Sequence, residues 1–521
     1  MDKLILAIDC GTQSTRALIF DSEGHLLDKK KVEYPSSYFS DEPGYAEQKA
    51  EVYWDSLKTA AQDLAARRPE LMQRVAGVGI TAQRDSLICL DKNGVPLRPA
   101  ILWLDVRKAK PCYRPGFLMK GVLSLVGMSE GVMRTQEEGK ANWIMQQEPE
   151  IWEKTYKLVQ VSGYLTQKLS GEFMDSIAAQ IGHLPFDYKK QEWYTSNSVN
   201  RKMFPVPLEK LPGLVKPGEK IGTVTQQASE LTGIPAGIPV IAAGSDKGCE
   251  TIGMGVLSQT MASLSFGTTA TVQTTSPRYF EPIPFMPAYP ACIPGYYNPE
   301  VEIFRGYWMI TWFKNQFAYE EVVEAHRRGI APEVMLDELL KKTPAGGHGL
   351  VMQPYWTPML KMPSAKGAII GFGDVHDRAY LYRTIIEGLA YGLKDGLSAI
   401  EHYGKVKATE VAVSGGASQS DEICRTTANV FNLPLVRGET YETSGLGAAM
   451  VVAAGLGFYS SVEEAARAMS RRSQCFMPDA ERSALYKELY ERVYKKMYGA
   501  LGPLYEEIRD ITNYPEKSVK W

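Results

Sequence analysis

The sequence pattern that most constrains the fold is a strand, a turn rich in glycine and threonine, and a second strand, which occurs twice. The first copy covers residues 4–20 and turns around Gly11, and the second covers 261–274 and turns around Gly267. Short apolar runs bounded by turn residues are typical of buried β-strands. Two such units form a weak internal repeat, which predicts two related α/β halves that meet near 245–260.

The remaining periodicity fits the same α/β class. Apolar residues at helical spacing predict helices at 49–67, 248–257, 379–403, from Ser418 or Ser420 to about Asn432, from Ser444 onward and at 479–511. Further short apolar runs predict strands at 75–80, 239–243 and 410–414. The stretch 107–135 has no clear period, and we expect irregular structure there.

Composition and charge exclude several classes of protein. The 521 residues carry 58 Lys and Arg against 60 Asp and Glu, so there is no electrostatic basis for binding nucleic acid or an anionic membrane. Asp9 interrupts the first apolar run too early for a signal peptide, and no apolar stretch approaches the roughly 20 residues of a membrane span. The seven cysteines are scattered without a CxxC pair, and the six histidines form no metal-binding spacing. We expect a cytoplasmic protein with reduced thiols.

The first turn has the composition of a phosphate-binding hairpin. Backbone N–H groups and hydroxyls gather there without a cation, and we expect Gly11, Thr12, Gln13 and Ser14 to hold phosphate oxygens. Asp9, at the end of the preceding strand, is placed to bind Mg²⁺ directly or through water. An ordinary Gly-Thr hairpin is the alternative. The chain has no GxxxxGK[ST] sequence, so the turn is not a Walker loop.

Two later turns strengthen this interpretation. A second turn of the same kind contains Gly267, Thr268 and Thr269, and two facing turns can grip a polyphosphate from both sides. A third turn follows the strand at 410–414, where adjacent glycines let a flat adenine lie against the backbone. The residues expected to contact adenosine are Gly415, Gly416, Ala417 and Ser420.

Further motifs stand between these turns in a fixed order. The full series is Asp9 to Arg16, Gly79 to Asp85, Ala100 to Asp105, Lys140 to Trp143 with Pro149, Gly244 to Asp246, Gly267 to Thr269, Asp377 and Arg378, Arg383, Glu387 and Gly388, and Gly415 to Ala417. In this order and spacing the chain resembles the FGGY carbohydrate kinases, the family of glycerol kinase and xylulokinase within the actin/Hsp70-like ATPase superfamily. The resemblance implies an α/β fold with two actin-like (ribonuclease H-like) domains flanking a central catalytic cleft.

By this resemblance Asp246 is the general base, which accepts the proton of a substrate hydroxyl as that oxygen attacks the γ-phosphorus of ATP. The resemblance also implies that Asp246 is a second ligand of Mg²⁺, beside Asp9. Its position before the segment 248–257 leaves a helix N-cap as an alternative or additional role. Positioning and charge neutralisation would carry most of the acceleration.

The resemblance further implies a sugar site in the N-terminal half. Its residues are Gln83, Arg84, Asp85, Trp103, Asp105, Asp246 and Lys247. Arg84 and Asp85 side by side could bracket vicinal hydroxyls, one donating and the other accepting, and a surface ion pair is the alternative. Trp103 would form an apolar wall and Asp105 a further acceptor. Lys247 departs from the Asn or Gln common at this position in the family, so its contact with the sugar does not transfer directly.

We therefore expect an ATP- and Mg²⁺-dependent kinase that phosphorylates a hydroxyl of a small sugar or polyol, such as xylulose, glycerol or erythritol. Residues 1–250 would hold the sugar and the first phosphate turn, and residues 251–521 the second phosphate turn and the adenosine site. A homodimer is a candidate assembly. Two other interpretations stay open: an actin- or Hsp70-like ATPase that acts on a protein partner, and a sugar-sensing pseudokinase.

Overall fold

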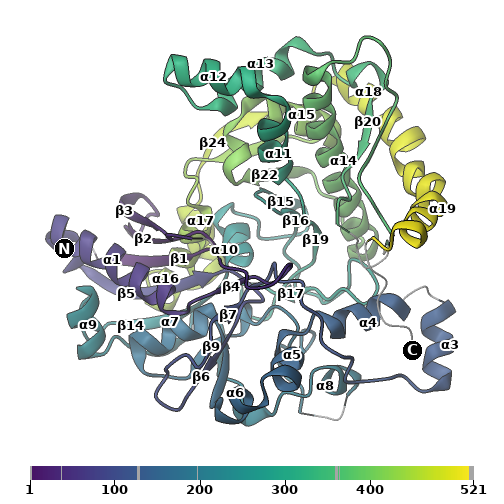
Figure 1. The fold of residues 1–521 in the computed structure, drawn as a ribbon. Coiled ribbons are helices and arrows are strands. Elements are labelled where there is room, and N and C mark those ends of the chain that lie inside the picture. The colour runs from purple at the N-terminus through teal and green to yellow at the C-terminus, as the bar shows by residue number, and fades with distance from the viewer. Residues whose placement is uncertain are drawn as a thin grey trace.

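Two six-stranded sheets, one from each half of the chain, frame the fold (Figure 1). The structure is a computed structural model, and it describes residues 3–514 apart from 37, 126–128, 196–197, 358–361 and 363. The N-terminal sheet has the strand order β13-β14-β5-β1-β2-β3, and the C-terminal sheet has the order β24-β23-β22-β15-β16-β19. In both sheets the strand that comes first in the chain is central, the second and third strands lie on one side of it, and the fourth lies on the other side.

The directions of the strands repeat as well. In each sheet the first strand pairs antiparallel with the second and parallel with the fourth, and the edge strand on the side of the fourth, β13 or β24, is antiparallel to its neighbour. The N-terminal strands are β1 Leu4–Cys10, β2 Ser14–Phe20, β3 Leu26–Glu33, β5 Val75–Ala82, β13 Lys220–Thr223 and β14 Pro239–Ser245. The C-terminal strands are β15 Met261–Phe266, β16 Ala270–Gln273, β19 Glu300–Ile303, β22 Glu410–Ser414, β23 Leu435–Gly438 and β24 Arg472–Phe476. The predicted repeat and the two-domain actin-like α/β class are confirmed.

Helices cover both faces of the N-terminal sheet, which explains why every residue of β1 is buried. On one face lie α1 (Glu51–Arg67) and α7 (Val161–Ser170), which share an apolar core with β1 and β5. On the other face lie α10 (Asp246–Gly253) and α16 (Thr443–Gly455). Asp246 thus begins a helix that packs directly on the sheet.

The C-terminal sheet has one apolar face and one polar face. Its apolar face packs on α11 (Trp308–Phe317), α14 (Arg378–Gly404) and α15 (Asp421–Phe431). Val301 and Ile303 of β19 belong to this core. Because side chains alternate along a strand, Glu300 and Glu302 lie on the opposite face, toward α10.

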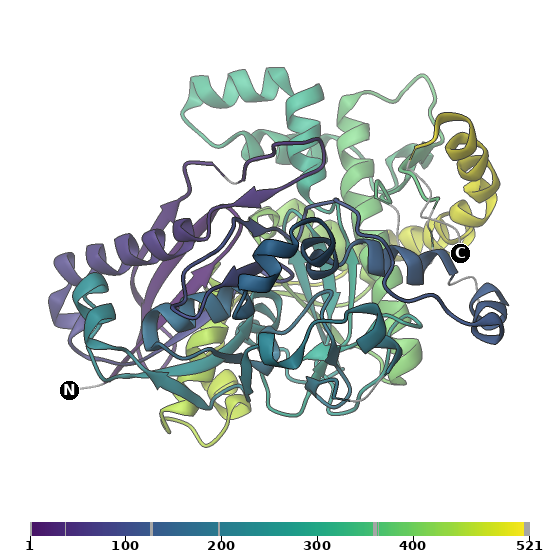
Figure 2. The ribbon, with the colours of Figure 1, turned by 60° about the horizontal axis from the view of Figure 1, so that its bottom comes forward.

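One segment of the C-terminal half packs on the N-terminal sheet. The helices α16 and α17 (Val462–Met469) share a core with β1, β2 and β14, and both views show them beside the purple strands (Figures 1 and 2). A single division at residue 250 therefore separates the two sheets but not all of the packing. The chain returns to the N-terminal sheet at this point, and α16 covers apolar residues on one face of that sheet.

Glycine allows α10 and α16 to pack backbone against backbone. A Cβ at Gly447 would lie 1.9 Å from the carbonyl oxygen of Cys249, and a Cβ at Gly253 would lie 2.1 Å from that of Thr443. This contact fixes the helix that begins with Asp246 relative to the sheet beneath it.

Gly447→Ala is expected to lower the free energy of unfolding by about 1–3 kcal/mol, because the added methyl group must push α10 and α16 apart. Gly499→Ala is the matched control: a Cβ at Gly499, inside α19 (Lys495–Thr512), meets nothing within 4 Å. That control should be neutral or stabilise by up to about 1 kcal/mol. Chemical unfolding of both variants measures the difference, and equal stabilities would show that the close helix contact is unimportant.

The other elements surround these two sheets. The smaller strands are β4 Glu47–Gln48, β6 Leu87–Leu90, β7 Ala100–Ile101, β8 Lys157–Gln160, β9 Met174–Ser176, β10 Phe186–Asp187, β11 Glu192–Trp193, β12 Gly213–Val215, β17 Tyr289–Pro290, β18 Tyr297–Asn298, β20 Val351–Gln353 and β21 Ala368–Ile370. The other helices are α2 Pro69–Met72, α3 Phe117–Leu125, α4 Ser129–Glu137, α5 Lys140–Gln147, α6 Pro149–Lys154, α8 Val199–Met203, α9 Gln226–Thr232, α12 Tyr319–Arg328, α13 Pro332–Lys342 and α18 Ala480–Leu489. Within the described ranges, no helix is long and apolar enough to cross a bilayer.

Three predicted elements differ from the structure. The stretch 107–135, expected to be irregular, contains α3 and α4, and its residues 126–128 lie outside the described residues. Each of these two helices has only nine residues, too few for a helical period to stand out in the sequence. The helix expected at 248–257 runs from Asp246 to Gly253, and the single helix expected at 479–511 is divided between α18 and α19 by a π-helical turn.

Candidate active site

Asp9 lies at the carboxyl end of β1, where the first turn begins. The turn closes with a hydrogen bond from the Gly11 N–H to the Ser14 carbonyl, 3.0 Å. Arg16 donates to the Asp9 carboxylate at 2.9 Å and approaches Glu442 at 3.5 Å. Burial raises the pKa of Asp9 to about 6, although Arg16 lowers it. The carboxylate is thus held in place by one cation and is poorly solvated.

Asp246 lies at the carboxyl end of β14. Ser245, not Asp246, is the N-cap of α10, because its hydroxyl accepts a hydrogen bond from the Gly248 N–H. The proposed capping role of Asp246 is therefore wrong, and its carboxylate accepts only from the adjacent Lys247 N–H at 2.8 Å within the described structure. Burial raises the pKa of Asp246, while Lys247 and Arg84 lower it.

The fold brings Asp9 and Asp246 to the same edge of the sheet. Their strands, β1 and β14, both run parallel to β5 and flank it, so the carboxyl ends of all three meet. The two carboxylates are close enough for the charge of Asp246 to raise the pKa of Asp9. Residues separated by most of the N-terminal half therefore form one acidic site.

This acidic site fits a magnesium ion that also binds phosphate. Each carboxylate has one oxygen occupied by a hydrogen bond, from Arg16 to Asp9 and from Lys247 to Asp246. No group of three or more metal-binding side chains occurs among the described residues. One or two carboxylates, completed by phosphate oxygens and water, are the usual Mg²⁺ site in phosphoryl-transfer enzymes.

The second and third turns touch each other. Gly415 has φ +87°, and a Cβ there would lie 2.7 Å from the carbonyl carbon of Phe266 and 3.1 Å from the Gly267 nitrogen. The backbone N–H groups of Tyr307 and Trp308 donate to the carbonyls of Gly267 and Thr268. These two hydrogen bonds hold the second turn in place. The turns expected to bind phosphate and adenosine therefore form one continuous surface.

Ser420 and Thr269 already have partners at this surface. Ser420 caps α15 through the Ile423 N–H and donates its hydroxyl to Asp337. The Thr269 hydroxyl donates to the Phe304 carbonyl at 3.2 Å. A hydrogen bond donated by Ser420 to adenosine would thus have to replace its bond to Asp337, whereas the hydroxyl can still accept one.

The Thr12 hydroxyl connects the first turn to the expected sugar residues. It donates to the Gln83 side chain at 2.7 Å and accepts from the Trp103 indole N–H at 2.9 Å. Gln83 in turn donates to the Tyr53 hydroxyl at 3.1 Å. Because these bonds occupy the hydroxyl, any contact of this turn with phosphate falls mainly to its backbone N–H groups.

Thr12→Val is therefore expected to affect the sugar more than the nucleotide. Loss of the two hydrogen bonds that orient Gln83 and Trp103 should lower kcat/KM for the sugar by about tenfold, since each is worth about 0.5–1.5 kcal/mol. The ADP dissociation constant should change by less than about threefold. Thr269→Val, on the opposite turn, is the control and should leave the sugar KM unchanged. A larger loss for ADP than for sugar in Thr12→Val would show that the hydroxyl binds phosphate directly.

Arg84 pairs across the two halves of the chain. Its guanidinium binds both oxygens of Glu300 of β19, at 2.9 and 3.2 Å, and lies 5.3 Å from the centre of the Tyr289 ring. Gln273 donates to the same carboxylate at 3.1 Å. The side chain of Glu300 has no exposed surface, and that of Arg84 is 14% exposed. This is a buried ion pair that joins the N-terminal sugar residues to the C-terminal sheet.

Asp85 has a separate set of partners. It has φ +50°, and its carboxylate accepts from Lys140 at 2.5 Å and from His183 Nδ1 at 3.1 Å. Burial opposes ionisation, but Lys140 and His183 hold the pKa of Asp85 below its usual range. The alternative of a surface pair between Arg84 and Asp85 is wrong, since each binds other residues in a partly buried setting.

Asp105 is enclosed by protein groups. Its carboxylate accepts from the Ala46 N–H at 2.6 Å and from the Arg107 guanidinium at 2.8 Å, and its side chain has no exposed surface. It supports the loop that carries Trp103 and offers no free oxygen to a sugar. Its predicted contact with substrate has no geometric support in this structure.

The sequence assigned no role in the site to several of its charged residues: Lys140, His183, Glu250, Glu300 and Glu302. Glu302 is half-buried near Arg84 and Asp246, and burial raises its pKa to about 7, although Arg84 lowers it. The signal that could have revealed the two β19 acids is the alternation Glu300-Val301-Glu302-Ile303, which places both on one face of a strand.

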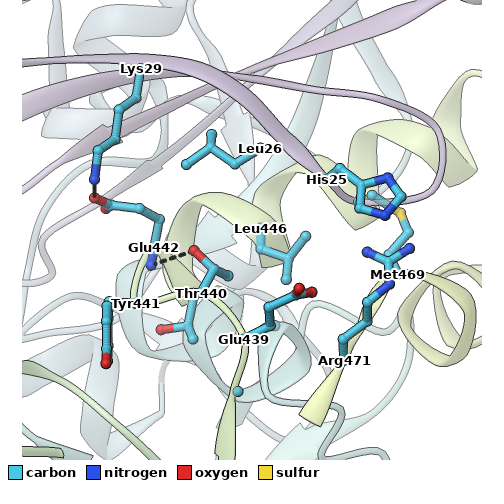
Figure 3. A pocket seen from close by; sticks show the side chains of 14 residues that line it. His25, Leu26, Lys29, Glu439, Thr440, Tyr441, Glu442, Leu446, Met469 and Arg471 are labelled. Atoms are coloured by element: carbon cyan, nitrogen blue, oxygen red, sulfur yellow. Dashed lines mark hydrogen bonds and ion pairs between the residues drawn. The ribbon is translucent and has the colours of Figure 1, made fainter. Parts of the chain in front are cut away.

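A pocket of about 340 Å³ has Glu442 in its lining (Figure 3). It lies between the β2–β3 hairpin and the segment 438–443, and Lys29 reaches Glu442 across it at 2.7 Å. Glu442 also approaches Arg16, the partner of Asp9. None of the expected ligand-binding residues is in its lining within the described chain, so we do not place the substrate there.

Known proteins match this chain along nearly all of its length. The FGGY family of carbohydrate kinases matches with its N-terminal domain at residues 4–253 and with its C-terminal domain at 262–456. The chain is 29% identical over 520 residues to the "Uncharacterized sugar kinase YgcE" of Escherichia coli (strain K12), covering 96% of this chain and 97% of that protein. It is 27% identical over 504 residues to the "Xylulose kinase" of Lactococcus lactis subsp. lactis (strain IL1403), covering 95% and 96%.

A solved structure shares the fold at lower identity. The gluconate kinase from Lactobacillus acidophilus superposes with a TM-score of 0.81 at 20% identity, covering 98% of this chain and all of that one. Both domain matches, in the order and at the positions of the two sheets, cover most of the sequence. The chain therefore belongs to the FGGY family of carbohydrate kinases and is an ATP-dependent sugar kinase.

Proposed function

We propose that this kinase transfers the γ-phosphoryl group of ATP to a hydroxyl of a small neutral sugar or polyol, with Asp246 as general base. The observation that carries the proposal is the meeting of Asp9 and Asp246 at one sheet edge. Around them lie the phosphate turn at Gly11 and the side chains of Gln83 and Trp103. The two acids, the turn at Gly11 and the side chains of Gln83 and Trp103 therefore lie close together.

In the proposed step the oxygen of the substrate hydroxyl forms a bond to the γ-phosphorus. The bond between that phosphorus and the β–γ bridging oxygen breaks, and its electron pair leaves with ADP. The hydroxyl proton goes to the Asp246 carboxylate. A base of this kind needs little intrinsic strength, because bond breaking is advanced in a loose transition state and proton transfer is late.

Asp9 and Asp246 would hold Mg²⁺ in this proposal. The ion would neutralise the negative charge that develops on the phosphate oxygens. Burial leaves Asp9 poorly solvated, so a cation at this position would gain from a carboxylate that Arg16 already orients. The backbone N–H groups of the turn at Gly11 would bind the transferred group from the N-terminal side.

The two halves would divide the work as the sequence suggested. Residues 1–250 would hold the sugar and the first phosphate turn, and residues 251–521 the second phosphate turn and the adenosine. The contact between the turns at Gly267 and Gly415 supports a nucleotide that lies across both. The identity with a xylulose kinase favours a ketopentose as the first substrate to test, with glycerol and erythritol as polyol candidates.

The test is an assay of ADP formation with MgATP and a panel of ketopentoses, polyols and aldonates. Formation of ADP and of a phosphorylated product with one member supports the proposal. Equal ADP formation without any sugar would favour an ATPase that acts on a protein partner. Binding of sugar and ATP without turnover would favour a pseudokinase. The homodimer and the cytoplasmic location stay predictions.

A further inference from the structure

The ammonium group of Lys247 lies beside the second phosphate turn. Lys247 is in the first turn of α10, directly after Asp246. Its Nζ donates to the hydroxyl of Ser265, the residue two before Gly267, at 2.6 Å. A Cβ at Gly267 would lie only 3.9 Å from this Nζ. The cation therefore stands over the start of the turn rather than toward the sugar residues.

Glu250 holds the ammonium in this position. Its carboxylate accepts from Lys247 Nζ at 2.9 Å, from the Ser265 hydroxyl at 3.0 Å and from the Ser414 hydroxyl. The side chain of Glu250 is only 7% exposed. Ser265 and Ser414 end or nearly end β15 and β22, the two strands that lead into the turns at Gly267 and Gly415. The cluster thus fixes the ammonium relative to both nucleotide-facing turns.

One N–H group of the Lys247 ammonium is available to donate a further hydrogen bond. A lysine ammonium carries three N–H groups, and Nζ bonds to two side chains, Glu250 and Ser265, within the described part of the chain. The side chain is 19% exposed, so the remaining donor has access to the space in front of the turn. Asp246, the proposed base, precedes Lys247 at the start of the same helix, so both residues enter the site from one element.

We propose that Lys247 is a catalytic residue that donates a hydrogen bond to a γ-phosphoryl oxygen of ATP. This inference rests on the proposed kinase function, and it differs from the sugar contact expected from the sequence. Lys247 keeps its proton throughout, while the substrate proton goes to Asp246. The positive charge of Lys247 is opposite in sign to the charge of the transferring phosphoryl group. A fixed ammonium group in a partly desolvated site stabilises such a charge well. The rival explanation is that Lys247 only neutralises buried Glu250.

The two explanations predict different changes in affinity for nucleotides with and without a γ-phosphate. Lys247→Met should weaken binding of the ATP analogue AMP-PNP, with Mg²⁺, by at least tenfold and binding of MgADP by less than threefold. Lys247→Arg, which keeps a cation, should lose less. Lys394→Met is the matched control, because Lys394 is a half-buried lysine whose ammonium group contacts the Val430 carbonyl and the Tyr490 ring, neither of which belongs to the site. It should leave both affinities unchanged.

Equal losses for AMP-PNP and ADP in Lys247→Met, or no loss for either, would overturn the inference. If Lys247→Met does not fold, the double variant Lys247→Met/Glu250→Gln removes the buried charge imbalance and is used for the same two titrations, with the same expected and overturning results. Failure of the wild-type protein to bind either nucleotide would contradict the proposed function itself. Isothermal titration calorimetry gives all of these affinities without turnover.

Discussion

Asp246→Asn is expected to lower kcat by at least about a hundredfold, the usual range for loss of a general base. Asparagine keeps the shape of the side chain and can still accept the Lys247 N–H bond. It cannot take the proton of the attacking hydroxyl, which must then leave to water. Because Ser245 caps α10, the substitution removes no helix cap, so folding should not change.

The measurement is steady-state turnover of the best substrate at saturating MgATP and saturating free Mg²⁺. Saturating metal separates loss of the base from loss of a metal ligand. Affinity for MgADP should change little, and the thermal unfolding midpoint should stay close to that of the wild type. A variant that keeps more than a tenth of the wild-type kcat would contradict the assignment of Asp246 as base.

Arg84→Met is expected to lower the free energy of unfolding by about 3–5 kcal/mol, the cost of leaving a buried partner charge uncompensated. Glu300 loses both hydrogen bonds from the guanidinium and, among the residues that the structure describes, keeps only the one from Gln273. Its side chain has no exposed surface, so water cannot replace what is lost. Since the pair joins the N-terminal site to the C-terminal sheet, sugar turnover should fall as well.

A double variant separates the ion pair from the rest of the site. Arg84→Met/Glu300→Gln removes both charges and should recover most of the lost stability. Arg327→Ala is the surface control: Arg327 pairs with Glu324 and its side chain is 70% exposed, so the free energy of unfolding should stay close to that of the wild type. Chemical unfolding measures all three. If Arg84→Met is as stable as Arg327→Ala, the buried pair does not hold the halves together.

These expectations differ from what the sequence alone suggested for Arg84 and Asp85. Adjacent opposite charges after a strand predicted a pair that brackets two hydroxyls. In the structure Arg84 binds Glu300, 216 residues away, and Asp85 binds Lys140, 55 residues away. The direction of each side chain depends on which strand and helix pack across it, and no local pattern contains that information. Whether either group also contacts the sugar stays a prediction.

The sequence alone was sufficient for the architecture and for the two acids at its centre. A buried strand and the glycine- and threonine-rich turn after it are local features, and their recurrence at 4–20 and 261–274 predicted two related α/β halves, which the two six-stranded sheets confirm. The sequence singled out Asp9 by its place at a strand end and Asp246 by the family resemblance, and the structure shows that their strands flank β5 and end at one edge.

Tertiary structure alone decided which polar groups remain free to act. In the folded chain the Thr12 hydroxyl is hydrogen-bonded to Gln83 and Trp103, and the Asp105 carboxylate is hydrogen-bonded to Arg107. The fold also turns Lys247 toward the second phosphate turn. The physical reason is that a buried polar group must find partners, and those partners come from segments that meet only when both sheets and the helices between them have packed.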